Sequence, residues 1–233
     1  MAQPEVEVAV ERFWRQPGVL TPEECARWSS GVYAARADWT PCFDGVQFTL
    51  GRAYYTHLEE DRADAYFAAA SDSDAAVERA LPELQARVRA ILAELVGAPV
   101  TPRPGWCGPG VHIFPAGGWL ADHGGDVHFD TEGLCDDDLG ARRPALSAIV
   151  MLQPPERGGG LRVWDALWDG RDDEAHVAAA ARADSAVADY AAGDLVLIDS
   201  YRLHQIQPFT GGRDRLSVTA HLVLADGGWH AWF

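Results

Sequence analysis

The sequence predicts an α+β protein, mainly β, in which helices near the N-terminus cover one outer face of a β core. Helical signals are concentrated before residue 105, whereas short β-type segments separated by Gly and Pro begin near Gly110. A chain of 233 residues is long enough for one domain with a sizeable core. We therefore expect a single domain over residues 1–233, with a largely helical support in 1–105 and a β sandwich or barrel in 106–233.

Two helical regions are expected before the β core. Residues 21–24 read Thr-Pro-Glu-Glu, a capping box with Pro at the first helical position, so a helix should begin there and run to about Ala34. A second region spans 74–96 and should break at Pro82. Its apolar residues repeat every 3.6 positions, which indicates a face packed on the core. These residues are Leu84, Val88, Ile91, Leu92 and Leu95.

Strands are expected wherever β-branched and aromatic residues form short runs between turn residues. Residues 45–58 form one such run and predict a strand or extended chain. The others are 111–114, 127–130, 146–152, 161–164, 195–198, 204–207 and 215–223.

The last of these segments alternates between polar and apolar residues, so its two faces should have different surroundings. We expect the polar face to line a site inside the β core and the apolar face to lie under the helices. The polar face carries Arg215, Ser217, Thr219 and His221, and the apolar face carries Leu216, Val218, Ala220 and Leu222.

The charge composition excludes several classes of function. Asp and Glu number 35 against 19 basic residues, which gives a formal net charge of −16. This charge disfavours a nucleic-acid partner, because such binding depends largely on cationic contacts with phosphates. The basic residues are all Arg, and without Lys the chain cannot form a Schiff base, attach pyridoxal phosphate or build a Lys-containing P-loop.

Neither a membrane nor a secretory location is expected. No run reaches the roughly 18 apolar residues that a membrane span requires. Residues 1–13 contain three Glu and no apolar core, so they do not predict a signal peptide. The four cysteines lack the spacing of a zinc site or a redox pair, which indicates reduced thiols in a cytoplasmic protein.

The candidate chemistry lies in three separated motifs. His128 and Asp130 stand two residues apart, so on a strand both would point to the same side. His204 follows a buried-strand pattern at 195–199, and together the three could form a two-His, one-carboxylate facial triad. Beyond them, Arg215 and Ser217 could bind a carboxylate through a guanidinium fork and a hydroxyl. His123, followed by two Gly, is a rival metal ligand.

These motifs, in this order, resemble the Fe(II)- and 2-oxoglutarate-dependent dioxygenases, especially their prolyl-hydroxylase-like branch. The resemblance spans roughly residues 110–225. It rests on residues 128–130, 146–155, 158–161, 192–199, 204–208 and 212–217.

The resemblance implies a double-stranded β-helix (jelly roll) with the metal between its two sheets. By position, His128, Asp130 and His204 would bind Fe(II), and Arg215, with Ser217 beside it, would hold the distal carboxylate of 2-oxoglutarate. Arg213 is the rival anchor, but it lies in a Gly-Gly turn. His112, His123 and four Trp residues near these motifs are candidates for substrate contact, although a structural role is the more common explanation for each of them. The four are Trp106, Trp119, Trp164 and Trp168.

The activity implied is hydroxylation of an unactivated C–H bond in a small metabolite, an amino acid or a natural-product intermediate. Dioxygen would be the oxidant, and 2-oxoglutarate would be converted to succinate and carbon dioxide. Halogenation is not expected, since halogenating relatives have Gly or Ala where this chain has Asp130. The alternatives are a peptidyl or carrier-bound substrate, a non-catalytic jelly-roll binding protein, and a cupin-like metal enzyme that does not use 2-oxoglutarate. The oligomeric state is not predicted.

Overall fold

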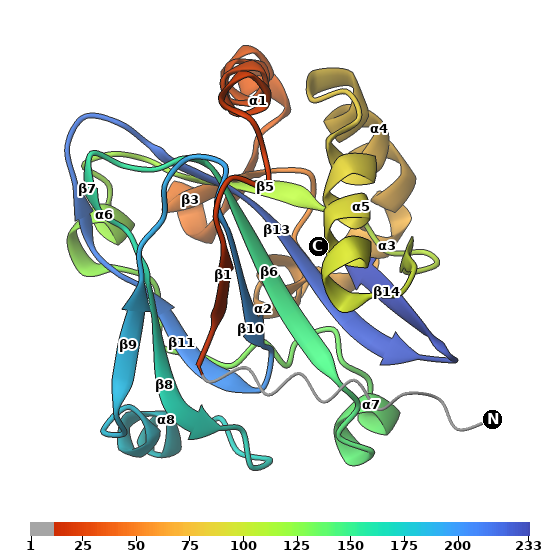
Figure 1. The fold of residues 1–233 in the computed structure, drawn as a ribbon, viewed down its shortest axis with the longest axis vertical. Helices are drawn as coiled ribbons and strands as arrows, with labels where there is room; N and C mark the ends of the chain where they lie inside the picture. Colours follow the sequence, from red (N-terminus) through yellow and green to blue (C-terminus); the bar gives the residue numbers. More distant parts are fainter. Residues whose placement is uncertain (1–11) are drawn as a thin grey trace.

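The computed structural model describes residues 12–233, so most of the segment screened for a signal peptide lies outside the described part. Within that part the chain forms a large mixed sheet, a three-stranded sheet and a two-stranded ribbon. Figure 1 shows the three-stranded sheet and the long helices on opposite sides of the large sheet. This is the double-stranded β-helix, with helices packed on one sheet, that the sequence led us to expect.

The large sheet has the order β1-β10-β6-β13-β5-β3-β2, with β14 and β4 added beside β13. All its pairs are antiparallel except β14 with β4. Its members are β1 (Trp14–Gln16), β2 (Thr40–Cys42), β3 (Gln47–Leu50), β4 (Val100–Pro102), β5 (Gly110–Phe114), β6 (Ala145–Gln153), β10 (Leu195–Asp199), β13 (Arg215–Ala225) and β14 (Gly228–Trp232).

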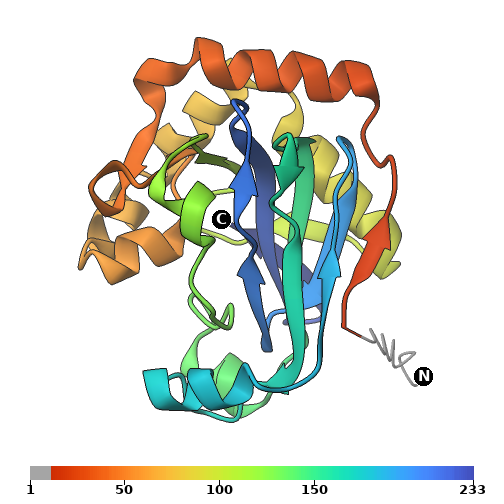
Figure 2. The same cartoon turned by 90° about the vertical axis from the view of Figure 1, so that its left-hand side faces the viewer.

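The smaller units form the opposite wall of the jelly roll. The three-stranded sheet has the order β11-β8-β9, and the ribbon pairs β12 with β7. Figure 2 shows the three-stranded sheet in front of the large sheet, with α1 across the top and α8 below. The strands are β7 (Arg157–Gly158), β8 (Leu161–Leu167), β9 (Ser185–Ala188), β11 (Arg202–Ile206) and β12 (Phe209–Thr210).

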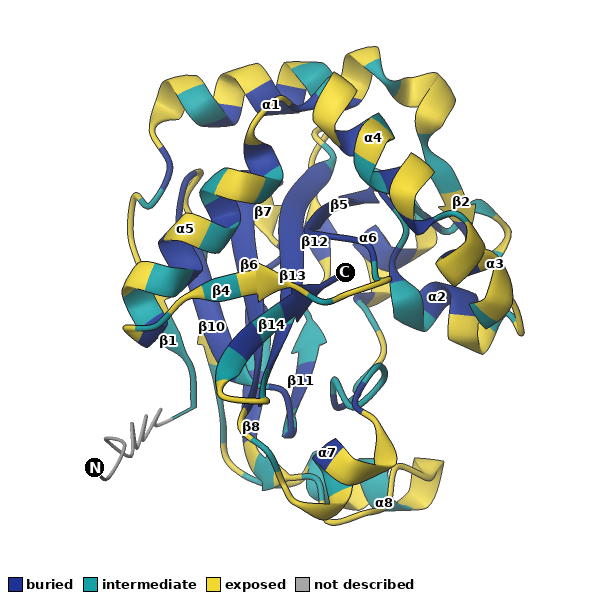
Figure 3. Cartoon of the chain, turned by 90° about the vertical axis from the view of Figure 1, so that its right-hand side faces the viewer, coloured by how far each residue is buried: buried dark blue, intermediate teal, exposed yellow. Residues whose placement is uncertain are grey.

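Three helices cover the outer face of the large sheet. Helix α1 begins at the predicted capping box, in which Thr21 Oγ1 accepts from the Glu24 amide at 3.1 Å and the Glu24 carboxylate accepts from the Thr21 amide at 2.8 Å. Figure 3 shows these helices with exposed outer faces and buried strands behind them. The three are α1 (Pro22–Ala34), α4 (Ala70–Ala80) and α5 (Leu84–Val96).

The remaining helices are short and lie in the connections. They are α2 (Tyr54–Glu59), α3 (Ala63–Ala68), α6 (Trp119–His123), α7 (Asp136–Gly140) and α8 (Glu174–Ala180), together with 3₁₀ turns at Arg36–Asp38 and Phe43–Gly45. No helix among residues 12–233 is long and apolar enough to span a membrane. The four cysteines are free thiols, as expected, and only Cys135 is exposed.

The main core lies between these helices and the large sheet. The four apolar residues of β13 named above are fully buried there, against the apolar stripe of α5 and residues of α1 and α4. Both the predicted break near Pro82 and the predicted core face of α5 are confirmed, since Glu83 adopts a left-handed conformation between α4 and α5.

Two expectations about elements were wrong. Residues 54–58 belong to helix α2 rather than to an extended segment, because Tyr54 turns inward to contact Tyr66 and Trp106. Residues 127–130 are not a strand. His128 makes one isolated bridge to His204, and the Asp130 amide donates instead to Ser200 O.

Candidate metal and cosubstrate site

The three predicted metal-ligand side chains meet in space. His128 Nε2 lies 3.4 Å from Asp130 Oδ1, and His204 Nε2 lies 3.3 Å from Asp130 Oδ2. One ligand atom from each residue can be chosen so that all three lie within 4.8 Å of one another. Divalent transition metals have bond lengths of about 2.1 Å, so neighbouring octahedral ligands are separated by about 3 Å. The observed separations therefore fit such an ion.

Backbone hydrogen bonds hold the ligands in place. The His128 and His204 amides each donate to the other's carbonyl, at 3.1 and 3.0 Å, which joins the loop before β6 to β11. Two residues later the Asp130 amide donates to Ser200 O at 2.9 Å. His128 and Asp130 are thus fixed by the loop that contacts β11, not by a strand of their own.

The orientation of each imidazole leaves the correct nitrogen free. His128 Nδ1 lies 2.9 Å from Asp126 O, and His204 Nδ1 lies 2.9 Å from Arg202 O. A carbonyl oxygen only accepts, so each Nδ1 carries a proton, and each Nε2 is turned toward Asp130. Nε2 is therefore the nitrogen of each ring that would bind a metal, once the ion displaces any proton there.

Asp130 is held in its ionised form. Burial alone would raise the pKa of Asp130, but the imidazoles of His204 and His221 and a hydrogen bond with His128 keep it well below its usual range. His221 Nδ1 lies 3.8 Å from Asp130 Oδ2 and also contacts Ser147 Oγ at 3.2 Å. His221 therefore lies next to Asp130 but is not one of the three candidate metal ligands.

Arg215 is a fully buried cation, with 1 % of its surface exposed. Its Nε donates to Gly159 O at 3.0 Å and its Nη1 donates to Ser217 Oγ at 2.9 Å, while Nη2 has no hydrogen-bond partner. No carboxylate among residues 12–233 forms an ion pair with it. A buried guanidinium without an anion is costly, so these contacts fit a site for an incoming carboxylate.

The rivals named from the sequence lie elsewhere. Arg213 is exposed in the turn before β13. His123 is exposed on α6, where it stacks on Trp119 with 4.6 Å between ring centroids. The glycine that follows His123 is required by the backbone, because the φ of Gly124 is +81° and a Cβ there would lie 2.6 Å from Ile206 O.

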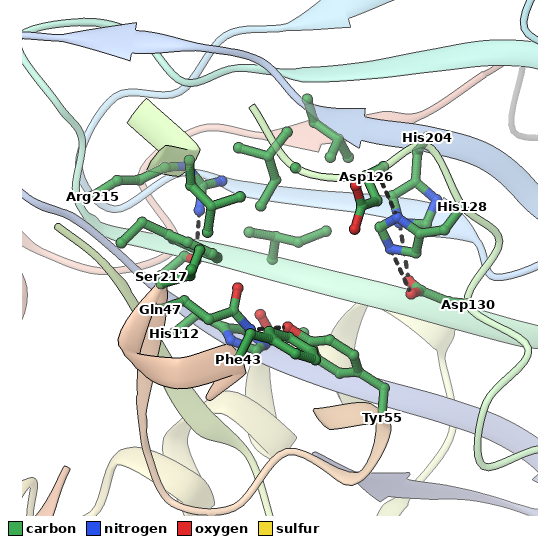
Figure 4. A pocket seen from close by; sticks show the side chains of 18 of the residues that line it. Phe43, Gln47, Tyr55, His112, Asp126, His128, Asp130, His204, Arg215 and Ser217 are labelled. Carbon is green, nitrogen blue, oxygen red and sulfur yellow. Dashed lines mark hydrogen bonds and ion pairs between the residues drawn. The ribbon is translucent and has the colours of Figure 1, made fainter. Parts of the chain in front are cut away.

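The triad and Arg215 line one cavity of about 500 Å³. Figure 4 shows Arg215 and Ser217 at one end and the triad at the other, with Gln47, Tyr55 and His112 between them on one side. The polar face of β13 points into this cavity, as expected, since Thr219 and His221 also line it. A volume of this size is typical of small-molecule sites.

The sequence did not point to the wall contributed by residues 43–59. Gln47 Nε2 donates to the Tyr55 hydroxyl at 2.5 Å, and both side chains line the cavity with Phe43 and Val46. Tyr55 lies on α2, which was expected to be extended, so its direction could not be inferred. His112, named above as a candidate for substrate contact, also lines the cavity, and it pairs with Ser217 across β5 and β13.

Of the four Trp residues considered as a substrate wall, Trp119 lines this cavity and Trp106 lines a neighbouring one. Trp164 and Trp168 pack in an apolar cluster under α8.

Comparisons with known proteins found one matching family model and several similar solved structures. The family model described as the carrier-protein-independent halogenase WelO5 matches residues 138–229, and no curated protein matches the sequence. An N-substituted L-amino acid dioxygenase from Burkholderia ambifaria, solved with α-ketoglutarate, is 15% identical with a TM-score of 0.60, covering 95% of this chain and 86% of its own. The non-heme α-ketoglutarate-dependent carbocyclase SnoK from nogalamycin biosynthesis is 15% identical with a TM-score of 0.60, covering 91% and 79%.

AviO1 from Streptomyces viridochromogenes is 16% identical with a TM-score of 0.56, covering 90% of this chain and 88% of its own. These likenesses extend over nearly the whole chain at low identity, so they concern the architecture. The resemblance noted in the sequence is thereby confirmed at the level of structure: this chain has the fold of the Fe(II)- and 2-oxoglutarate-dependent oxygenases.

Proposed function

We propose that this protein is an Fe(II)- and 2-oxoglutarate-dependent dioxygenase that oxidises a C–H bond of a small molecule. His128, Asp130 and His204 would hold the iron, and Arg215 with Ser217 would hold the distal carboxylate of 2-oxoglutarate. The observation that carries the proposal is that the buried, anion-free Arg215 faces the same cavity as the three ligand side chains. A metal site alone would not require such a cation.

When bound, iron and 2-oxoglutarate supply an oxidant made from dioxygen, with release of succinate and carbon dioxide. The residues of the chain position the reactants. Arg215 Nη2 and Ser217 Oγ can fix one end of the cosubstrate, and the two Nδ1 hydrogen bonds fix the imidazoles at the other. Apolar residues such as Ile149, Leu161 and Phe114 line the space between and reduce its water content.

The proposed outcome is oxygenation, or another oxidation such as desaturation, rather than halogenation. The matched halogenase model begins at residue 138, beyond Asp130. A halide would need the place that the Asp130 carboxylate takes beside both imidazoles, and its negative charge would be repelled by that carboxylate. Once a substrate is known, product mass under heavy oxygen gas in bromide buffer checks this. A brominated main product would contradict the role given to Asp130, whereas one labelled oxygen would agree with it.

The proposal is tested by anaerobic titration with Fe(II) and 2-oxoglutarate, followed by admission of oxygen and a succinate assay. We expect both ligands to bind and succinate to form in an iron-dependent manner. A non-catalytic binding protein would bind 2-oxoglutarate without forming succinate. A cupin-like enzyme that does not use 2-oxoglutarate would bind the metal without a measurable affinity for the cosubstrate.

A further inference from the structure

The mouth of the cavity carries three carboxylates beyond the triad: Glu59, Asp126 and Glu132. Glu59 and Asp126 are exposed at the rim and Glu132 is half-buried. None of the three forms an ion pair with an Arg among residues 12–233. Figure 4 shows the Asp126 carboxylate beside the imidazoles of His128 and His204.

Arg215 is the one cationic side chain, His aside, among the described residues of this lining. In the proposed function it is committed to the cosubstrate. Iron(II), the 2-oxoglutarate dianion, Asp130 and Arg215 form an electrically neutral set. The charge that a substrate meets is therefore that of the carboxylates at the mouth. Burial raises the pKa of Glu132 to about 7 and also raises that of Glu59, so a cation bound beside them would favour their ionised, negative forms.

A buried imidazole in the same lining also has unused bonding capacity. His112 is 6 % exposed, its Nδ1 has no hydrogen-bond partner, and it lies along the cavity between the two ends. Burial lowers the pKa of His112 to about 3, so the ring is neutral and offers no cation to an anionic ligand. It can accept a hydrogen bond from an N–H or O–H donor or donate one through its own N–H.

A second cavity of about 450 Å³ adjoins the first and shares Glu59 and Glu132 with it. Its aromatic wall includes Tyr54 and Trp106. The Arg103 side chain there is already engaged, because it donates to Gly133 O, lies 3.7 Å from Asp138 Oδ2 and packs over Trp106. The two shared carboxylates thus stand between a largely apolar cavity and a more polar one that Asp172 also lines, and neither cavity offers a free Arg.

We propose that the substrate of this site is an amine, a small molecule with a largely apolar body, a protonated nitrogen and no free carboxylate or phosphate. Glu59 and Glu132 bind the nitrogen at the boundary between the two cavities, and Asp126 adds to the attraction. The inference rests on the proposed function for placing the reaction in this cavity. It narrows the substrate class, because a free amino acid would bring a carboxylate for which no cation remains, and like charges at a binding site cost affinity.

The test compares three probes of similar shape and different charge: 2-phenylethylamine, 2-phenylethanol and 3-phenylpropionate. Their affinities are measured by calorimetry on the full chain, both metal-free and loaded anaerobically with Fe(II) and 2-oxoglutarate. In the loaded protein we expect the amine to bind about tenfold more tightly than the alcohol, and the acid more weakly than either. An acid that binds as well as the amine to the loaded protein overturns the inference.

Variants identify the groups responsible. Glu59→Gln and Glu132→Gln should each weaken amine binding about threefold, as expected for one partly exposed charge, and leave the alcohol unaffected. The double variant should remove most of the preference for the amine. Glu94→Gln, an exposed residue on α5, is the matched control and should change nothing. A preference that survives in the double variant would reflect the acidity of the whole protein and overturns the assignment.

The succinate assay without added substrate keeps the two proposals apart. Succinate formation with no amine preference overturns the substrate class and leaves the oxygenase proposal standing. An amine preference in a protein that forms no succinate overturns the oxygenase proposal, while the ligand class stands as a binding property. Stimulation of succinate formation by the amine, but not by the acid, supports both.

Discussion

Arg215 holds a position that is unfavourable in the absence of a ligand. Its guanidinium lies over the rings of Phe114 and Tyr190, at 5.3 and 5.5 Å from their centroids, and burial lowers its pKa. Only neutral oxygens, Gly159 O and Ser217 Oγ, accept from it. Gly159 is itself constrained, since its φ is +73° and a Cβ there would lie 2.7 Å from Pro155. The Gly-rich turn therefore places the Gly159 carbonyl where it accepts a hydrogen bond from Arg215 and fixes the orientation of that side chain.

Replacing Arg215 by Met should separate binding from folding. Loss of a buried charge partner costs about 3–5 kcal/mol, which corresponds to about two to three and a half decades in affinity. We expect Arg215→Met to weaken 2-oxoglutarate binding at least a hundredfold, measured by calorimetry with Fe(II) under anaerobic conditions. The melting temperature of the ligand-free variant should stay close to that of the wild type, because no ion pair is lost.

Arg213→Met is the matched control and should bind 2-oxoglutarate normally, since Arg213 is exposed. A reversed ranking of the two variants would move the anchor to Arg213.

His128→Ala should abolish iron-dependent succinate formation and reduce the iron retained after gel filtration. The side chain is 42% exposed, so the metal-free variant should remain folded by circular dichroism. His123→Ala supplies the comparison, because His123 stacks on Trp119 away from the triad. If the His123 variant lost iron while the His128 variant kept it, the choice between the two histidines would be wrong.

At this scale, the residues chosen from the sequence for their chemistry line one cavity: His128, Asp130, His204, Arg215 and Ser217. Strand alternation places Arg215 and Ser217 there, whereas a loop bridged to β11, which the sequence did not reveal, places His128 and Asp130. Gln47 and Tyr55 reach the cavity from an irregular segment. Nothing local distinguishes them from packing residues.

Among the elements, local signals succeeded where they were strong and failed where tertiary contacts decided. The capping box fixed the start of α1, and alternation fixed the two faces of β13. Strand β14, at residues 228–232, was not expected, although Trp232 is fully buried beside β13. It follows a Gly-rich turn and ends near the C-terminus, where a short run gives little periodicity.

The acidic run 136–138 forms the first turn of α7. Asp138 is 2 % exposed and pairs with Arg143 at 2.9 Å. The burial of Asp138 depends on its ion pair with Arg143, a residue outside the acidic run, so the run alone cannot reveal it.

Strand β1 is attached to the large sheet partly through Asp194, in the turn before β10. The Asp194 carboxylate is 4 % exposed and accepts from the amides of Ala191 and Gly18 at 2.9 and 3.1 Å, and from Arg15 Nη2 at 2.5 Å. Burial alone would raise the pKa of Asp194, but these hydrogen bonds and the charge of Arg15 keep it below its usual value.

Asp194→Asn should therefore destabilise the fold by about 1–3 kcal/mol at neutral pH, measured by urea unfolding. The folded-state pKa lies below the unfolded value near 3.8, so the ionised carboxylate contributes fully above that pH. The difference between wild type and variant should shrink as the pH falls below it. A difference that stayed constant down to pH 3 would show that the effect is one of shape rather than of charge.

For the molecule as a whole, a net charge of −16 without any Lys should govern non-specific association. We expect the protein to pass through a heparin column at low salt and to bind an anion exchanger. Heparin retention that fell with rising salt would reveal a basic surface, and the exclusion of nucleic-acid substrates would no longer hold.

The expectation of one domain, with a helical support in 1–105, remains a prediction, and limited proteolysis would test it. Its N-terminal part also contributes four strands to the large sheet. Of these, β3 lies within the expected segment 45–58, whereas β1, β2 and β4 were not expected.

The reciprocal backbone bridge between His128 and His204 means that the proposed ligand frame is assembled by folding itself. A metal ion would then bind to, and leave, a site that is already folded, unlike in zinc fingers, where the metal drives folding. Such a frame accepts Mn²⁺, Co²⁺ or Ni²⁺ as readily as its geometry permits, and affinity should rise along that series in the Irving–Williams order. The relative supply of metals would then decide which ion occupies the protein in a cell. Cobalt or nickel, when abundant, would displace iron from the site and inhibit the protein.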